Sequence, residues 1–225
     1  MQFNHTNMKK ILLPLIAVSI LSACTNVPKA DKASTTEKQA VAAADGVVIS
    51  TDSNSTLTWT GTKPTGTHTG LFKLKEGNVV VKDNNLTGGS FVIDINSLSN
   101  LDLPESDKPK LEGHLKSPDF FDVEKYPTAK FEITSVEPFK PGASEDVVMK
   151  DATHTIKGNL TLKDSTKNIA FPAKIEIAAG KVTAVADFNI DRTAWGMNYK
   201  GPNNPADWVI RKAVNLKLNI SASKK

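Results

Sequence analysis

The stretch KLEGHLKSPDFFDVEKYPTAKF (residues 110–131) is rich in aromatic residues, in a chain where only 6% of all residues are aromatic. Leu111 and Leu115 stand four residues apart, a spacing that places two apolar side chains on one face of a helix. Pro118 and Pro127 each disfavour helical conformation in the residue before them. The stretch therefore predicts a short helix, then an apolar plug at its two consecutive phenylalanines, then a strand. A connection of this length in a strand-rich chain is typically a lid, a cap or a binding loop.

On both sides of this stretch apolar and polar residues alternate, which is the period of a half-buried β-strand. About nine strand candidates follow one another within Val47–Ile220, at the spacing of hairpins. Turns are predicted at Gly77, at Asp83–Asn85 and at Ala179–Gly180, and Val147–Lys150 is a short strand candidate. Because no long helix connects neighbouring strands, the sheet is expected to be antiparallel. Periodicity alone fits a sandwich as well as a closed barrel.

Three motifs carry a resemblance to a known family. The first consists of His114–Ser117, Asp119–Asp122 and Tyr126–Pro127; the second is Gly158–Leu162 (GNLTL); the third is Phe188–Met197 (FNIDRTAWGM). In this order they resemble the YceI-like family of bacterial secreted proteins. The resemblance implies an all-β fold with one or two short helices, built as an antiparallel lipocalin-like barrel of about eight strands. It also implies a polyisoprenoid chain held inside the barrel.

The first 24 residues have the layout of a secretory signal peptide. Lys9–Lys10 is positively charged, and Ile11–Leu21 is an apolar run too short to span a bilayer as a helix. Leu21–Cys24 resembles a bacterial lipobox, so Cys24 is expected to become a lipidated N-terminus; ordinary cleavage with an incidental cysteine is the alternative. Met8 is a second candidate for the start of the chain.

The sequence after the leader divides into two parts. Residues 25–45 are rich in Ala, Lys, Thr and Ser and predict a flexible tether, with a short helix over Glu37–Ala44 as the alternative. Residues 46–225 are predicted to form the barrel. The expected location is the bacterial cell envelope, with the domain exported, lipid-anchored and facing the periplasm. Thr25 after the cysteine favours the outer membrane over the inner one.

Charge and cysteine content exclude several classes of function. From Gly46 onward basic and acidic residues are nearly balanced, so nothing indicates nucleic-acid binding. Cys24 is the only cysteine, so the exported domain has no thiol for a disulfide, a nucleophile or a metal.

The aligned apolar faces contain small residues beside aromatic ones, which leaves room on one side of a lumen. The small positions are Gly70, Gly158, Ala173, Ala184 and Ala186. A closely packed core in which small and large residues alternate explains the same pattern. The resemblance favours an apolar slot for a lipid. The residues expected to contact that lipid are Trp59, Phe72, Phe91, Ile93, Leu115, Phe120, Phe121, Phe131, Phe171, Phe188, Trp195 and Met197.

The polar candidates are few. His68, His114 and His154 are far apart and show no metal-ligand spacing, so no metal site is predicted. His114 is expected either to bond the backbone near the lid or to lie beside a ligand head group. Asp119 is expected to bond backbone amides in its turn. A general acid–base pair of Asp119 and Asp122 is the catalytic alternative.

Arg192 is the other candidate for a head-group contact, because a guanidinium group binds phosphate bidentately. An ion pair with Asp187, Asp191 or Asp207 is the structural alternative. One departure from the family pattern lies before His114, where Glu112-Gly113 replaces the Arg-Asp that the family often shows.

The sequence therefore predicts a non-catalytic protein that carries or stores a long isoprenoid chain of polyprenyl or quinone type. No cofactor is expected besides that lipid; the expected partners are the lipid and the membrane, and a homodimer stays open. An enzyme or accessory factor of isoprenoid or quinone metabolism is the first alternative, although the G-x-S-x-G, Walker and Rossmann patterns do not occur. A ligand-free structural or stress-related envelope protein is the second.

Overall fold

The computed structural model describes residues 27–140, 147–201 and 209–224, and the predicted signal peptide with Cys24 lies outside them. The described chain is all-β with two short helical elements, as predicted. Its elements are β1 (Asp31–Lys32), β2 (Ser34–Glu37), β3 (Val47–Ser50), β4 (Thr56–Lys63), β5 (Gly66–Lys82), β6 (Asn85–Asn100), α1 (Lys108–Lys116), β7 (Thr128–Pro138), β8 (His154–Leu162), β9 (Ser165–Ala178), β10 (Lys181–Asp191), the 3-10 helix η1 (Arg192–Trp195) and β11 (Ala213–Ser223).

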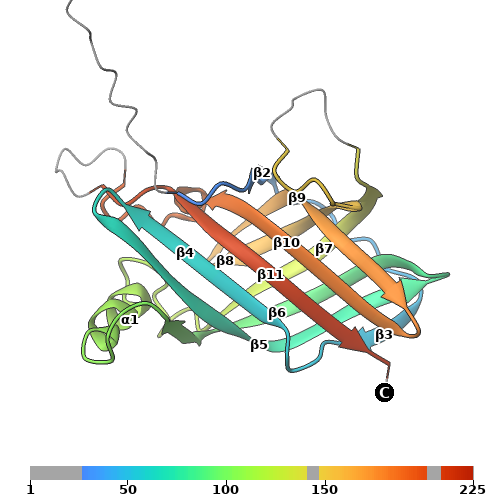
Figure 1. Cartoon of the computed structure of the whole chain (residues 1–225), viewed down its shortest axis with the longest axis horizontal. Coiled ribbons are helices and arrows are strands. Elements are labelled where there is room, and N and C mark those ends of the chain that lie inside the picture. Colours follow the sequence, from blue (N-terminus) through green and yellow to red (C-terminus); the bar gives the residue numbers. More distant parts are fainter. Residues whose placement is uncertain (1–26, 141–146, 202–208, 225) are drawn as a thin grey trace, which may run out of the picture.

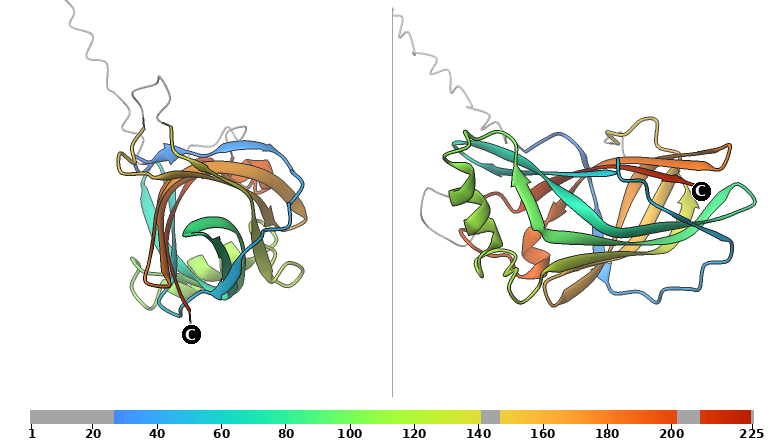
Figure 2. Two further views of the ribbon diagram at one scale, coloured as in Figure 1. Left: turned by 90° about the vertical axis from the view of Figure 1, so that its right-hand side faces the viewer. Right: turned by 90° about the horizontal axis from the view of Figure 1, so that it is seen from below.

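Eight of the strands form a closed antiparallel barrel. Their order is β10-β11-β4-β5-β6-β7-β8-β9, and a further pairing between β9 and β10 closes the ring (Figure 1; Figure 2). β3 lies outside the ring and pairs with β5. The prediction of an antiparallel lipocalin-like barrel of about eight strands is confirmed, and with it the choice of a barrel over a sandwich.

Tight hairpins connect the long strands. Asp83 and Asn84, between β5 and β6, have φ of 49° and 60°, and Ala179 and Gly180, between β9 and β10, have φ of 49° and 73°. Positive φ at both central residues is the geometry of the type I′ turn, whose twist matches that of the flanking strands. Both of these predicted turns are confirmed.

Two local predictions are wrong. No turn occurs at Gly77, because β5 runs unbroken through this residue for 17 residues, or roughly 55 Å. A Cβ at Gly77 would lie 2.6 Å from Thr51 Oγ1, so the glycine makes room for a neighbouring side chain. Val147–Lys150 forms no strand; instead the amides of Val148 and Met149 donate to the carboxylate of Asp31 at 3.0 and 2.8 Å.

The prediction of a flexible tether is wrong for the part of residues 25–45 that the structure describes. Residues 27–45, which we call the strap, run along the outside of the barrel (blue in Figure 1 and Figure 2). Within the strap β1 pairs with β10 in parallel, and β2 pairs with β9 in antiparallel orientation. The alternative helix over Glu37–Ala44 is also absent, since Glu37 ends β2 and residues 38–45 are irregular. Main-chain hydrogen bonds hold the strap, and these need no apolar side chains.

The hydrophobic core lies inside the barrel, where alternate residues of every ring strand point inward. The closest aromatic pair is Phe171 and Phe188, whose rings stack with centroids 4.0 Å apart. Within the described residues, no helix has the length and apolar character needed to cross a bilayer.

Candidate ligand-binding cavity

Two cavities lie end to end inside the barrel. The inner chamber has a volume of about 120 Å³, and every side chain that lines it is apolar. The cap-end chamber has a volume of about 510 Å³ and lies next to α1 and the connection after η1. Leu57, Ile93, Leu160 and Leu216 line both chambers, so the two share part of their wall. Together they have the size that is typical of ligand pockets.

The small residues singled out in the sequence divide into two groups. Ala173, Ala184 and Ala186 line the inner chamber, where their short side chains leave space. Gly70 and Gly158 instead make room for rings: a Cβ at Gly70 would lie 2.5 Å from the Trp59 ring, and one at Gly158 would lie 2.3 Å from the Phe131 ring. The open lumen therefore depends on the alanines, and the glycines serve packing.

The structure places eleven of the twelve predicted contact residues on the walls of the two chambers. They are Trp59, Phe72, Phe91, Ile93, Leu115, Phe120, Phe121, Phe131, Phe171, Phe188 and Met197. Trp195 lies elsewhere: it is only 1% exposed, its indole N–H donates to the Leu160 carbonyl at 2.9 Å, and it lines neither chamber. Trp195 therefore packs in the core behind the chamber wall.

An aromatic cluster lies at the cap end. His114 lies edge-on to Phe120 and to Tyr199, with ring centroids 5.2 and 4.8 Å away. Its Nε2 lies 3.0 Å from Asp119 Oδ2. Asp119 was expected to bond backbone amides, but it bonds the His114 ring instead. His114 was expected either to bond the backbone or to lie beside a head group, and in the structure it bonds the Asp119 side chain. The cluster joins residues 108–126, which we call the cap, to the connection that follows η1.

Arg192 lines the cap-end chamber but is held by the backbone. Its guanidinium donates to the carbonyls of Met197, Tyr199 and Ile210, and its Nε donates to that of Arg211. No ion pair joins Arg192 to Asp187 or Asp191, two of the three aspartates of the structural alternative, and the third, Asp207, lies outside the described residues. Burial lowers the pKa of Arg192, and the nearby charge of Asp191 opposes this effect. The side chain fastens the connection to the barrel, and its contact with a head group stays a prediction.

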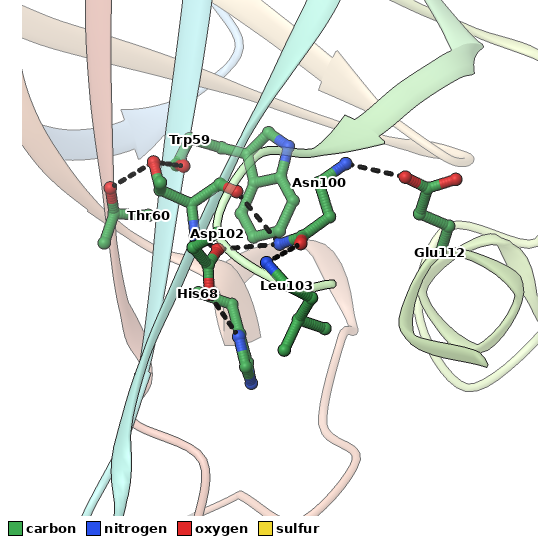
Figure 3. Close-up of polar contacts among 8 residues, drawn as sticks. Trp59, Thr60, His68, Asn100, Asp102, Leu103 and Glu112 are labelled. Atoms are coloured by element: carbon green, nitrogen blue, oxygen red, sulfur yellow. Dashed lines mark hydrogen bonds and ion pairs between the residues drawn. The ribbon is translucent and has the colours of Figure 1, made fainter. Parts of the chain in front are cut away.

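A polar network fastens the cap to the rim of the barrel (Figure 3). The backbone N–H of Asn100 donates to Glu112 Oε1 at 2.7 Å, which ties α1 to the end of β6. The Asn100 side-chain amide donates to Asp102, which also accepts from His68 Nδ1 at 2.8 Å and from the Thr69 N–H at 2.7 Å. Burial raises the pKa of Asp102, but these hydrogen bonds outweigh it and leave the pKa below its ordinary value. Glu112, noted in the sequence as a departure from the family, is thus the residue that docks the helix.

Sequence reasoning missed a set of basic residues at the cap end. Lys63, Lys110 and Lys200 line the cap-end chamber together with His68, and none of the described residues that line it is acidic. A signal was present for Lys63, which shares a strand face with Trp59 through the two-residue period. No comparable signal marked Lys200, which lies in an irregular connection.

The two candidate acids of the cap have defined contacts in the structure. Among the described residues, no group of three His, Cys, Asp or Glu side chains lies close enough to hold a metal. Asp122 shapes the turn of the cap, because its φ is 51° and its carbonyl accepts the N–H of Tyr126 at 2.8 Å. With Asp119 paired to His114, both acids have structural contacts.

Comparisons with known proteins agree with this fold. A family model described as YceI-like domain matches residues 48–222. BcnA from Burkholderia cenocepacia is 18% identical, with a TM-score of 0.56 over 75% of this chain and 96% of that one. A polyisoprenoid binding domain from Saccharophagus degradans, implicated in plant cell wall breakdown, is 14% identical, with a TM-score of 0.56 over 80% and 100%. A YCEI protein from Campylobacter jejuni is 16% identical, with a TM-score of 0.50 over 97% and 99%.

At these identities the solved structures show a likeness of fold alone. Among curated proteins nothing matches the chain. The family model, however, spans well over half of the sequence. The chain therefore belongs to the YceI-like domain family.

Proposed function

We propose that this protein binds a long-chain isoprenoid lipid, of polyprenyl or quinone type, and carries or stores it without catalysis. The observation that carries the proposal is the pair of chambers placed end to end inside a closed barrel, with aromatic and aliphatic walls. The likeness to a polyisoprenoid binding domain from Saccharophagus degradans supports the choice of lipid.

Burial of the hydrocarbon chain supplies most of the proposed affinity. Each buried CH₂ contributes about 0.8 kcal/mol, and the loss of freedom on binding offsets part of the sum. The stacked rings of Phe171 and Phe188 and the alanines of the inner chamber provide a preformed apolar surface for it.

The two chambers differ in polarity, and this difference orients the ligand. The far end of the chain lies in the inner chamber, which has an entirely apolar lining, and the head group lies in the larger cap-end chamber beside Lys63, Lys110 and Lys200. Two buried polar atoms of the cap-end wall, Trp59 Nε1 and Thr62 Oγ1, have no hydrogen-bond partner among the described residues. Ammonium and N–H donors suit an oxygen-rich head such as a phosphate or a quinone.

The leader of the sequence supports a proposal about the place of action. We propose that Cys24 anchors the protein by a lipid in the cell envelope, facing the periplasm, with the outer membrane favoured. A carrier at this place exchanges its lipid with the nearby membrane.

The direct test is native mass spectrometry of the gently purified full chain, followed by solvent extraction and analysis of the extract. We expect a mass excess that matches one extracted lipid with an isoprenoid chain. A protein whose mass equals that of the polypeptide, and which takes up neither ubiquinone nor all-trans-retinol when these are added, contradicts the proposal. An extract of straight-chain lipids only contradicts the choice of isoprenoid while leaving lipid binding intact.

A further inference from the structure

Strands β9 and β10 pair along only part of their length. Beyond their hairpin, Lys181–Val185 pair with Lys174–Ala178, and the pairing then stops. From there Lys167–Ala170 of β9 pair with β2, and Phe188–Asn189 of β10 pair with β1. The strap thus occupies the place where these two ring strands part, and it completes the wall of the barrel there.

The opening that the strap fills faces the inner chamber. Where β9 and β10 part, Ile169 and Phe171 of β9 line that chamber on one side of the opening. Ala186 and Phe188 of β10 line it on the other side. Ala33 lies between β1 and β2, is 3% exposed and belongs to the same apolar core. One strand between two others separates them by about 10 Å, which is two strand spacings. Without the strap, only the side chains that meet across this gap, such as the stacked rings of Phe171 and Phe188, would separate the inner chamber from the outside.

Asparagines on the outer face hold the strap at two places, Pro28–Ala30 and Gln39. Asn189 donates to the carbonyls of Pro28 and Ala30 at 3.1 and 3.4 Å. Asn159 accepts the N–H of Gln39 at 3.0 Å and donates to its carbonyl at 2.8 Å. Asn159 is 1% exposed although its neighbours in β8 point inward, so the strap covers it from outside.

These bonds can be exchanged for bonds to water. The four side chains of β2 are exposed, so the strap buries little apolar surface apart from Ala33. Asn159 and Asn189 lie on the outer face, and both become solvated when the strap leaves, so no polar group stays buried without a partner. Segments held in this way open at a much lower free energy than the strands of a barrel.

We propose that the strap is a detachable seal over a lateral portal between β9 and β10, through which the lipid chain enters and leaves the inner chamber. The proposal rests on the proposed function, since it requires a lipid in the lumen. A lipid chain that enters through the side of the barrel does not have to pass the aromatic cluster of the cap. It also places the moving part directly after the proposed membrane anchor.

A disulfide across the strap tests the portal. Ser34 and Ala170 are directly paired residues of β2 and β9, and paired strand residues lie within the Cα separation that a disulfide requires. The full chain carries Ser34→Cys and Ala170→Cys with Cys24→Ser, so that these are its only thiols. The matched control is Thr58→Cys with Lys217→Cys, a pair that joins β4 to β11 away from the portal. The probe is all-trans-retinol, whose fluorescence rises in an apolar site.

We expect the oxidised strap pair to slow retinol uptake by about tenfold or more relative to its reduced form, with the same amount bound at saturation. The oxidised control should match its reduced form. Equal uptake rates for the oxidised and reduced strap pair overturn the portal. If no form of the protein binds retinol or ubiquinone, the proposed function fails instead.

Hydrogen exchange tests the strap without any ligand. We expect the amides of Ala33–Glu37 to exchange together, at least about a hundredfold faster than those in the middle of β11. Replacement of Asn159 by Ala should speed the exchange of the strap further, while replacement of the exposed Asn219 by Ala should not. If the strap amides exchange only when the whole barrel unfolds, the strap does not detach by itself and the proposal is overturned.

Discussion

Gly70 lets a tryptophan lie flat across the barrel wall. A Cβ at this position would lie 1.9 Å from the Ser99 carbonyl oxygen and 2.5 Å from the Trp59 ring. The first contact is with backbone, which cannot move aside cheaply. The position of Trp59 in the cap-end wall therefore depends on a missing side chain on the neighbouring strand.

Replacement of Gly70 by Ala should lower the free energy of unfolding by about 1–3 kcal/mol, the usual cost of overpacking. The same substitution at Gly113, whose Cβ would meet nothing within 4 Å in α1, should raise it by about 0.5–1 kcal/mol. Urea unfolding of the two variants checks both signs. Equal effects at the two positions would show that the close approach at Gly70 does not matter.

Asp102 should contribute to a pH dependence of stability. Its pKa in the folded protein lies below the ordinary value, so its ionised form is favoured by folding. The contribution is fully present above the unfolded pKa of about 4 and is lost as the pH falls through the lower folded value. We expect the difference in unfolding free energy between the wild type and Asp102→Asn to be constant near pH 7 and to shrink below about pH 4. Asp164→Asn serves as the control, and a difference for Asp102→Asn that does not change with pH would refute this role.

For individual residues, the sequence predicted apolar contacts better than polar ones. Phe171 and Phe188 could be placed on the wall because the two-residue period determines the face of a strand. The four carbonyl partners of Arg192 could not be predicted, because a backbone carbonyl is present at every position and only the fold brings the carbonyls of Met197, Tyr199, Ile210 and Arg211 together.

Helix α1 depends on its docking to the barrel. It has nine residues, no side-chain cap at its N-terminus, no acidic residue in its first turn and no buried residue. A helix this short is marginal in water by itself. Its contacts with the rim, which include the bond from the Asn100 N–H to Glu112 and the packing of Leu111 and Leu115 against the core, therefore decide whether the cap stays in place.

Replacement of Glu112 by Ala should loosen the cap. It removes the acceptor of the Asn100 N–H, a change that typically costs about 1–3 kcal/mol. We expect hydrogen exchange in Lys108–Lys116 to be faster by roughly tenfold. Glu124→Ala, at an exposed position of the same cap, should leave the exchange rate of these amides unchanged. A closed cap in the Glu112 variant would mean that apolar packing alone holds α1.

The strands were predictable as elements, while the strap was not. Alternation in Lys181–Asp191 predicts a strand because each inward side chain must be apolar. The strap pairs through its backbone and the side chains of β2 are exposed, so its sequence carries no such pattern. A composition typical of a flexible linker is therefore compatible with an ordered strand when the partner strands offer free edges.

The molecule as a whole is a closed ring around an elongated lumen, and the space within that lumen is its functional property. Ala186 is 3% exposed to solvent and lines the inner chamber. A large side chain at this position would occupy the space proposed for the lipid chain while leaving the outer surface unchanged.

Replacement of Ala186 by Phe should therefore reduce the amount of retinol bound at saturation by about tenfold or more, since the apolar contact area inside the chamber is lost. Asn219→Phe adds the same ring to an exposed outward position and should bind as the wild type does. Fluorescence titration gives both stoichiometries, and circular dichroism verifies that the barrel is intact. Unchanged binding by a folded Ala186→Phe protein would place the ligand elsewhere.

The docking of the strap also fixes how far the barrel can move from a membrane. A free tether from Cys24 to residue 45 would reach about 70 Å when fully extended. The chain is already bound to the barrel at Pro28, whose carbonyl accepts from Asn189, so the free reach from Cys24 is only about 14 Å. Asn189 is next to Ile190, which lines the cap-end chamber. With Cys24 as the proposed anchor, a short linker keeps the barrel beside the bilayer. Contact between the barrel and the membrane is then an intramolecular event. The rate of lipid exchange by the anchored protein should then depend on the length of this linker and should be independent of the protein's concentration.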